Sequence, residues 1–332
     1  MGHTPMMPMF FNHDTPGAPL LTGGQNFNLS LVLKFCLVQA GWTVVWEDAT
    51  ARKICFRNDA NEGNGCYFLV DETPASMAYM DIGEGWDDTT KTLINNVALA
   101  SPWTRGTYKG ASADNRQWWI VADNRTFYAQ ISGKFLGQAV ETVDGTVGSW
   151  YQWPFAAGDY TRFDGKPGVF LAATWSNSAS LPSQSNNSIG VTGYSLPDMN
   201  RSKPSIGVTR GADGKIASSC VAALVPATYN SGYIIGESSS VIIADNPYLT
   251  FSQNYMLYTS NANSNTMGVS GVFRGLWYPN FRVYSVCSGV QLDQTWRSLG
   301  NSNFSELLIF AGKDSNSTGS IWYMGVEKGR PW

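Results

Sequence analysis

The stretch Trp118-Trp-Ile-Val-Ala122, Asp123-Asn-Arg125, Thr126-Phe-Tyr-Ala-Gln-Ile131 indicates the class of fold most directly. Two runs of β-branched and aromatic residues flank a short polar triplet, which is the pattern of a β-hairpin. Similar short runs occur along most of the chain, separated by turn-rich segments such as 58–65 and 71–74. The sequence therefore predicts a mainly β protein.

Further strands are expected in two groups, one before and one after a polar stretch in the middle of the chain. The first group is expected at 42–47, 52–57, 66–70, 76–82 and 169–175. The second is expected at 206–209, 221–225, 233–235, 241–244, 255–258, 269–276, 281–286, 306–310 and 321–324. Strands at this spacing without intervening helices are typical of a sandwich or a distorted barrel.

Residues 28–39 form the one strong helix candidate. Asn26 or Asn28 can cap its start, and Gly41 can adopt the left-handed conformation that ends it. Apolar residues surround most of its circumference, so we expect an N-terminal helix that is buried on nearly all sides.

The domain organisation follows from where prolines and polar residues gather. Residues 1–20 are rich in proline, which predicts an extended N-terminal arm. Residues 21–175 are predicted to form a β-rich domain with the one helix, and residues 206–332 a β-rich C-terminal domain. Residues 176–205 have the composition of a loop and are predicted to be a polar irregular linker or loop.

The composition excludes several classes of function. Charged residues make up 14% of the chain and the net charge is −3, which argues against a nucleic-acid-binding surface. No run approaches 18 apolar residues, so we expect no membrane span. His3 and His13 are the only histidines. Catalysis or metal binding through histidine is therefore not expected in the rest of the chain.

No motif for catalysis, a cofactor or a metal stands out. Three sets of carboxylates lie near aromatic residues and could in principle hydrolyse glycosides: Asp87 with Asp88, Glu141 with Asp144, and Asp159 with Asp164. Nothing in their spacing forces two of them onto a shared face. Calcium-loop and phosphate-loop patterns are absent from the sequence. We therefore expect a protein that is not an enzyme and needs no cofactor or metal.

The five cysteines have no close C-x-x-C spacing, and Cys36, Cys55, Cys220 and Cys287 sit among apolar neighbours. They are predicted to be small buried residues with free thiols. A bridge between Cys55 and Cys66 across a hairpin is the alternative.

Several segments in order along the chain carry a resemblance to one family. They are 17–23 (Gly-Ala-Pro-Leu-Leu-Thr-Gly), the helix at 29–38, Gly41-Trp42-Thr43, 54–57, 67–71, the hairpin at 119–128, and 273–276 with Tyr278-Pro279. Together they resemble virion structural proteins of tailed bacteriophages and prophages. The resemblance implies a virion protein that is made in the host bacterial cytoplasm and belongs to the tail or the baseplate.

Candidate interface residues follow from the aromatic content of the chain. Buried interface cores are poor in charge and rich in aromatic residues, methionine and arginine, and this chain has 44 aromatic residues and 10 methionines. The candidates are Phe10 and Phe11 in the arm, Trp150 and Trp153 in an aromatic cluster, and Trp277 and Trp332 near the end. Each candidate also has an alternative without a partner. The arm and the last segment could be frayed ends, and the other aromatic residues could fill a β core.

The hypothesis at this point is a non-enzymatic structural component of the phage tail or baseplate. Its partners would be other virion subunits, and copies of the chain would form a homo-oligomer within a symmetric assembly. One alternative is a receptor-binding or carbohydrate-binding module at the tail tip, with a host surface glycan as partner. Another is a capsid decoration protein.

Overall fold

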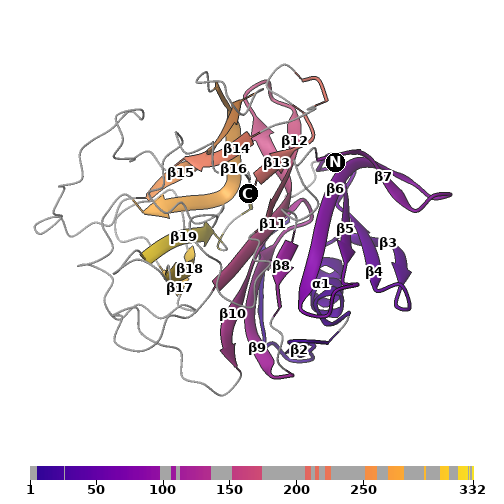
Figure 1. The fold of residues 1–332 in the computed structure, drawn as a ribbon. Coiled ribbons are helices and arrows are strands. Elements are labelled where there is room, and N and C mark those ends of the chain that lie inside the picture. Colours follow the sequence, from indigo (N-terminus) through magenta and orange to yellow (C-terminus); the bar gives the residue numbers. More distant parts are fainter. Residues whose placement is uncertain are drawn as a thin grey trace, which may run out of the picture.

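The computed structural model describes residues 6–25, 27–97, 106–109, 113–135, 152–173, 206–210, 214–216, 221–225, 251–259, 268–279, 295–296, 307–313, 321–327, 329 and 331–332. This part of the chain is mainly β, as predicted, with one helix and two antiparallel sheets (Figure 1). Neither sheet closes into a barrel within the described residues. Of the two predicted architectures, the structure is therefore compatible with the sandwich-like one.

The larger sheet has 13 strands in the order β1-β9-β10-β11-β12-β13-β14-β15-β16-β19-β18-β17, with β2 also paired to β9. Its strands are β1 (Met9–Asn12), β2 (Leu21–Thr22), β9 (Asn115–Ala122), β10 (Thr126–Phe135), β11 (Gln152–Arg162), β12 (Pro167–Ala173), β13 (Ile206–Val208), β14 (Val221–Val225), β15 (Phe251–Thr259), β16 (Gly268–Pro279), β17 (Thr295–Trp296), β18 (Leu307–Lys313) and β19 (Ile321–Glu327). The strands expected at 233–235, 241–244 and 281–286 lie outside the described residues.

The predicted hairpin is confirmed as β9 and β10. Ala122 pairs with Phe127, and the triplet 123–125 forms the turn between them. The side chain of Trp118 is buried in one hydrophobic cluster and that of Trp119 in another. A strand that is buried on both faces needs apolar residues at every position. This explains why residues 118–122 do not alternate between apolar and polar side chains.

The predicted domain boundary at 176–205 lies outside the described residues and stays a prediction. The strands on either side of it pair with each other, since Phe170 of β12 lies opposite Val208 of β13. Strand β11 also pairs with β16 through Thr161 and Val272. Strands from both sides of the predicted boundary therefore belong to the larger sheet.

The smaller sheet has six strands in the order β3-β4-β5-β6-β7, with β8 also paired to β6. They are β3 (Thr43–Asp48), β4 (Lys53–Arg57), β5 (Tyr67–Asp71), β6 (Met77–Asp87), β7 (Thr92–Asn96) and β8 (Gly106–Tyr108). In β5 and in residues 78–82 of β6, buried residues alternate with partly exposed ones, whereas Ile54, Cys55 and Phe56 of β4 are all buried. This alternation is typical of an antiparallel sheet that covers a core with one face.

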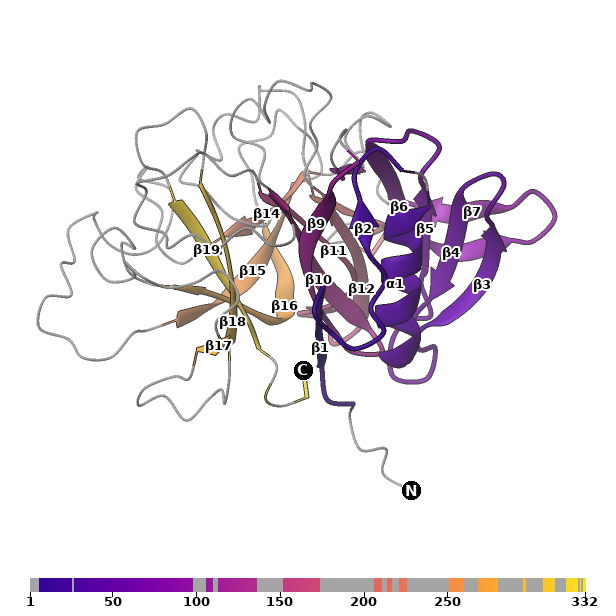
Figure 2. The same cartoon turned by 90° about the horizontal axis from the view of Figure 1, so that it is seen from below.

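Helix α1 (Asn28–Gln39) lies alongside the smaller sheet, close to β2 of the larger sheet (Figure 2). The expectation of burial on nearly all sides is wrong, because Leu31 and Val38 are 41% and 47% exposed. The predicted ending is confirmed, since Gly41 follows the helix with φ of 91°. Asn28 does not cap the start: Phe27 holds that position without a side-chain hydrogen bond, and Asn26 lies outside the described residues.

Two hydrophobic clusters form the described core. The first fills the space between α1, the smaller sheet and one face of the larger sheet, and includes Val32, Phe68 and Phe127. The second lies on the opposite face of the larger sheet and includes Tyr128 and Phe273. Because β9 and β10 contribute to both clusters, this hairpin forms the wall between them.

Candidate functional site

The centre of the candidate site is the turn between β9 and β10. Oδ1 of Asp123 accepts hydrogen bonds from the backbone N–H groups of Arg125 (2.8 Å) and Thr126 (2.7 Å). Aspartate is favoured in such turns because its side chain can bond to the backbone two or three residues ahead. The carbonyl oxygen of Asp123 also accepts a hydrogen bond from Nε1 of Trp42 (2.8 Å). The turn is thereby tied to the residue that precedes β3.

The turn also binds the loop between β4 and β5 of the smaller sheet. The backbone N–H of Asp59 donates to the carbonyl oxygen of Asn124 (2.8 Å). In return, Nδ2 of Asn124 donates to Oδ2 of Asp59 (3.2 Å) and Oε2 of Glu62 (2.9 Å). These bonds join a turn of the larger sheet to a loop of the smaller one.

Asp159, on β11, joins the same turn and loop from the other side. Its carboxylate accepts hydrogen bonds from Nδ2 of Asn58 (2.9 Å), the backbone N–H of Asn64 (3.2 Å) and Nε of Arg125 (3.2 Å). Its backbone exchanges hydrogen bonds with the hydroxyl of Thr126. The side chain of Asp159 is fully buried, so its carboxylate depends on these three donors for its hydrogen bonds.

Arg274, on β16, connects the turn to the last residue of this sequence. Its Nη2 lies 3.3 Å from Oδ2 of Asp123 and also donates to the carbonyl oxygen of Trp332. The hydroxyl of Tyr128 donates to the carbonyl oxygen of Arg274 (2.7 Å), and its ring meets that of Trp332 edge-on. Gly275 has φ of 61°, and a Cβ there would collide with the indole of Trp332.

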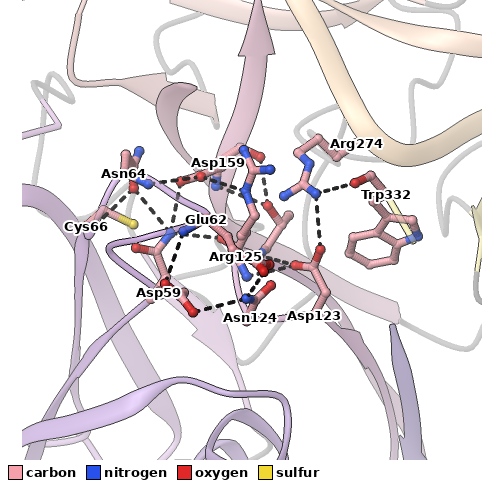
Figure 3. Close-up of polar contacts among 12 residues, drawn as sticks. Asp59, Glu62, Asn64, Cys66, Asp123, Asn124, Arg125, Asp159, Arg274 and Trp332 are labelled. Carbon is pink, nitrogen blue, oxygen red and sulfur yellow. Dashed lines mark hydrogen bonds and ion pairs between the residues drawn. The ribbon is translucent and has the colours of Figure 1, made fainter. Parts of the chain in front are cut away.

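We call this network the polar hub and define it by eight residues: Asp59, Glu62, Asn64, Asp123, Asn124, Arg125, Asp159 and Arg274. Figure 3 shows their side chains pointing toward one another, with Trp332 at the edge. The hub joins the loop of the smaller sheet, the β9–β10 turn, β11 and β16. Segments far apart in the sequence are therefore fixed to one another by hydrogen bonds and ion pairs.

Burial is the largest influence on the pKa of Asp123 and of Asp159. It raises the pKa of Asp159 to about 6, although Arg125 and Asn58 act in the opposite direction. Burial also raises the pKa of Asp123, against the lowering effect of Arg274. The two side chains are 0% and 2% exposed. A general acid must reach the substrate's proton, and these carboxyl groups are enclosed.

Three sets of carboxylates were candidates for acid–base pairs in the sequence analysis. Where the structure describes their residues, it does not place them as such pairs. Hydrogen bonds from the Thr90 hydroxyl and nearby N–H groups lower the pKa of Asp87, and Lys91 lowers that of Asp88. A general acid needs a raised pKa, so that it keeps its proton near neutral pH. Asp164 is paired with Arg162 at 2.9 Å, in the turn after β11. Glu141 and Asp144 lie outside the described residues.

A second buried ion pair lies at the start of helix α1. The carboxylate of Glu72 accepts hydrogen bonds from the backbone N–H groups of Ser30 (2.5 Å) and Leu29 (3.3 Å). It is also bound by Nζ of Lys109, which donates to the carbonyl oxygen of Gln25 (2.8 Å) as well. Both charged side chains are 0% exposed. Glu72 therefore supplies the helix cap that the sequence analysis assigned to an asparagine.

The predicted interface residues of the arm have contacts within the chain. Phe10 and Phe11 lie on β1, which pairs with β9. Phe11 is buried in the first cluster, and Phe10 packs against the second. Trp332 also packs against the second cluster, and its Nε1 donates to the carbonyl oxygen of Glu327 (2.6 Å). These three side chains are therefore engaged in the fold itself.

The other predicted interface residues are placed only in part. Trp153 lies on β11 opposite Ile131, and Trp277 lies on β16 opposite Gln253. Trp150 lies outside the described residues. The cysteine prediction is confirmed where it can be followed, since Cys36, Cys55 and Cys66 are buried with free thiols. Cys220 and Cys287 also lie outside the described residues.

Sequence reasoning missed the hub although it named two of its parts. It identified the 123–125 turn, and it named Asp159 only as one member of an acid pair. The signal available was the concentration of Asp, Asn and Glu in the loop 58–65 and in the turn, because polar residues placed between strands often bond to each other. That signal does not say which loop meets which turn.

Comparison with known proteins gave no relative: no protein-family model and no curated protein sequence matches this chain. The described residues contain no group of three or more His, Cys, Asp or Glu side chains that could hold a metal ion. Among the same residues, no helix has both the length and the apolar character needed to cross a membrane.

Proposed function

We propose that the protein is a non-enzymatic structural subunit of a tailed-phage virion, in the tail or the baseplate. It would act through contacts with other virion subunits. The resemblance in the sequence supports the virion part of this proposal. The polar hub is the observation that supports a structural role.

The hub supports a structural role because its charged side chains bind other groups of the same chain. Asp123 and Asp159 are both enclosed and paired with arginines, so their contacts hold the turn, the loop and the strands in one specific arrangement. Glu72 and Lys109 do the same for helix α1. A subunit that is already rigid loses little conformational freedom when it assembles, so more of its contact energy is available for binding its neighbours.

Mass spectrometry of purified phage particles tests this proposal. Particles from cells that encode the chain would be separated from free protein, and the copies of each protein per particle counted. We expect the chain in the particle fraction at the copy number of other tail proteins. Hundreds of copies per particle would indicate a capsid decoration protein. Absence from the particles would contradict the proposal.

One observation favours a carbohydrate-binding module as the second candidate. Trp46 on β3 and Trp86 on β6 are both partly exposed, and their ring centroids lie 5.8 Å apart with an interplanar angle of 34°. Partly exposed indole rings can stack on the apolar faces of sugars. A glycan array with purified protein, repeated with Trp86→Ala, tests this candidate: specific binding that the substitution abolishes would support it.

A further inference from the structure

Trp332 is bound by residues on three strands of the larger sheet. Its indole lies so close to Gly275 of β16 that a Cβ atom there would be 2.3 Å from Nε1. Its ring meets that of Tyr128 of β10 edge-on, with 5.5 Å between the centroids. The carbonyl oxygen of Trp332 accepts a hydrogen bond from Nη2 of Arg274, and its Nε1 donates to the carbonyl oxygen of Glu327 (2.6 Å). We call Tyr128, Arg274, Gly275 and Glu327 the indole site.

The indole site is held in place by contacts that do not involve the tryptophan. Arg274 and Gly275 lie on β16, and Glu327 is the last residue of β19, which pairs with β16. The hydroxyl of Tyr128 donates to the carbonyl oxygen of Arg274 (2.7 Å). Nη2 of Arg274 also lies 3.3 Å from Oδ2 of Asp123 in the polar hub (Figure 3). We therefore expect the site to keep its shape when the tryptophan leaves it.

The segment that carries the tryptophan is short and lies at the surface. Trp332 packs against the second hydrophobic cluster but is only half-buried, so the indole site is open to solvent on one side. Gly329 lies in the link between β19 and Trp332, and glycine leaves such a link free to change direction. Residues 328–332 span at most about 18 Å when extended. The segment can therefore reach the indole site of another copy only when the two copies are in direct contact.

We propose that the indole site binds residues 328–332 of a second copy of the chain as well as those of its own chain. The residues that hold the tryptophan all lie in the sheet, so they make the same contacts with a tryptophan of the same chain and with one from a neighbour. Exchange of an identical element between copies is a low-cost route to assembly for this reason. The inference rests on the proposed function, because it names one of the contacts between subunits.

Two features make this contact suited to an assembly. Tryptophan and arginine are enriched among the residues that dominate interface energies, and here they meet in an enclosed place, since Arg274 is 7% exposed and Tyr128 is fully buried. Neighbouring copies in a particle are also held close together, so the segment of a neighbour reaches a high effective concentration at the site. Because Arg274 also pairs with Asp123, the bound segment is connected to the polar hub.

Two substitutions separate the indole site from the segment that fills it. Trp332→Ala leaves the site empty. Gly275→Ala blocks the site and leaves the tryptophan free, because the new Cβ would lie where the indole lies. We expect a mixture of the two variants to form a complex in sedimentation velocity, in which the tryptophan of one chain fills the site of the other. The mixture should associate at least about tenfold more tightly than either variant alone, or than the double variant Gly275→Ala, Trp332→Ala.

A peptide tests the same site without a second folded chain. It would have the sequence of residues 328–332 and a fluorescent label at its N-terminus. We expect saturable binding to Trp332→Ala in fluorescence anisotropy, together with a rise in the melting temperature of that protein. The double variant should bind the peptide at least about tenfold more weakly, and so should the wild type, whose site is already filled. A peptide with alanine in place of the tryptophan is the matched control and should bind none of these proteins.

A peptide that fails to bind Trp332→Ala, although circular dichroism shows this protein to be folded, would overturn the inference. Equal binding to Trp332→Ala and to the double variant would also overturn it, because the peptide would then bind elsewhere. If the peptide bound but the mixed variants formed no complex, the site would serve its own chain only, which contradicts exchange between copies. Absence from virions would contradict the proposed function alone, because all of these measurements use the isolated protein.

Discussion

Asp159 is the residue whose chemistry depends most on the fold. Its carboxylate accepts three hydrogen bonds, and burial raises its pKa to about 6 from an ordinary value of 3.8. The groups that face it come from three places: Asn58 and Asn64 from the loop between β4 and β5, Arg125 from the turn between β9 and β10, and Arg274 from β16. The folded protein therefore holds a proton on Asp159 more tightly than the unfolded chain does. This difference has a measurable consequence for stability.

The free energy of unfolding contributed by Asp159 should decrease as the pH rises from about 4 to about 6. Below this window the group is protonated in both states, and its contribution is fully present. Above it the folded state holds a buried charge, and about 3 kcal/mol is lost. Urea unfolding of the wild type and Asp159→Asn at several pH values would measure this. A difference between the two proteins that does not change from pH 4 to 6 would contradict the prediction.

Gly275 is the other residue with a specific requirement. Its φ of 61° and the close approach of the Trp332 indole both favour glycine. Gly275→Ala should destabilise the wild type by about 1–3 kcal/mol. The same substitution should cost less in a Trp332→Ala background, where only the backbone strain remains. Equal losses in both backgrounds, measured by urea unfolding, would show that Trp332 does not occupy this position.

At the scale of elements, helix α1 depends on a pair of residues from two other parts of the chain. Glu72 follows β5 and Lys109 follows β8, yet both lie at the N-terminal end of the helix. Removing one member leaves the other as a buried charge, which commonly costs 3–5 kcal/mol. Glu72→Gln should therefore destabilise the protein by about this amount in urea unfolding. The double variant Glu72→Gln, Lys109→Met should lose less free energy of unfolding than Glu72→Gln alone. A larger loss in the double variant would contradict an ion pair between the two residues.

Strand β1 offers a comparison of adjacent residues. Phe11 is buried in the first cluster, whereas Phe10 is only half-buried against the second. Phe11→Ala should reduce the free energy of unfolding by about 3–5 kcal/mol, and Phe10→Ala by clearly less. Thermal or urea unfolding of the two variants measures this. If both substitutions reduced the free energy of unfolding by the same small amount, β1 would not be part of the fold.

The elements were easier to predict than the contacts between them. The hairpin at 118–131 and the helix at 28–39 follow from local patterns of apolar and turn residues. The cap of the helix does not, because Glu72 lies 42 and 43 residues from the N–H groups it binds. Asn58 and Asp159 are 101 residues apart. Such contacts are set by how the sheets pack, and no local pattern encodes that.

At the scale of the whole molecule, the contacts between the sheets indicate a rigid subunit. The polar hub fixes the two sheets to each other, and the ion pair between Glu84 and Arg210 adds a second connection. A surface to which both sheets contribute keeps its shape as long as these connections hold the angle between the sheets.

The position of the chain on phage particles tests most directly whether it is a structural subunit of the tail or baseplate. A gold-labelled antibody against the chain would be viewed on intact particles by electron microscopy, with particles from cells that lack its gene as the control. We expect label at the tail or baseplate. Label over the head would contradict the tail assignment. Particles that carry neither label nor, by mass spectrometry, the chain itself would contradict a structural role in the virion.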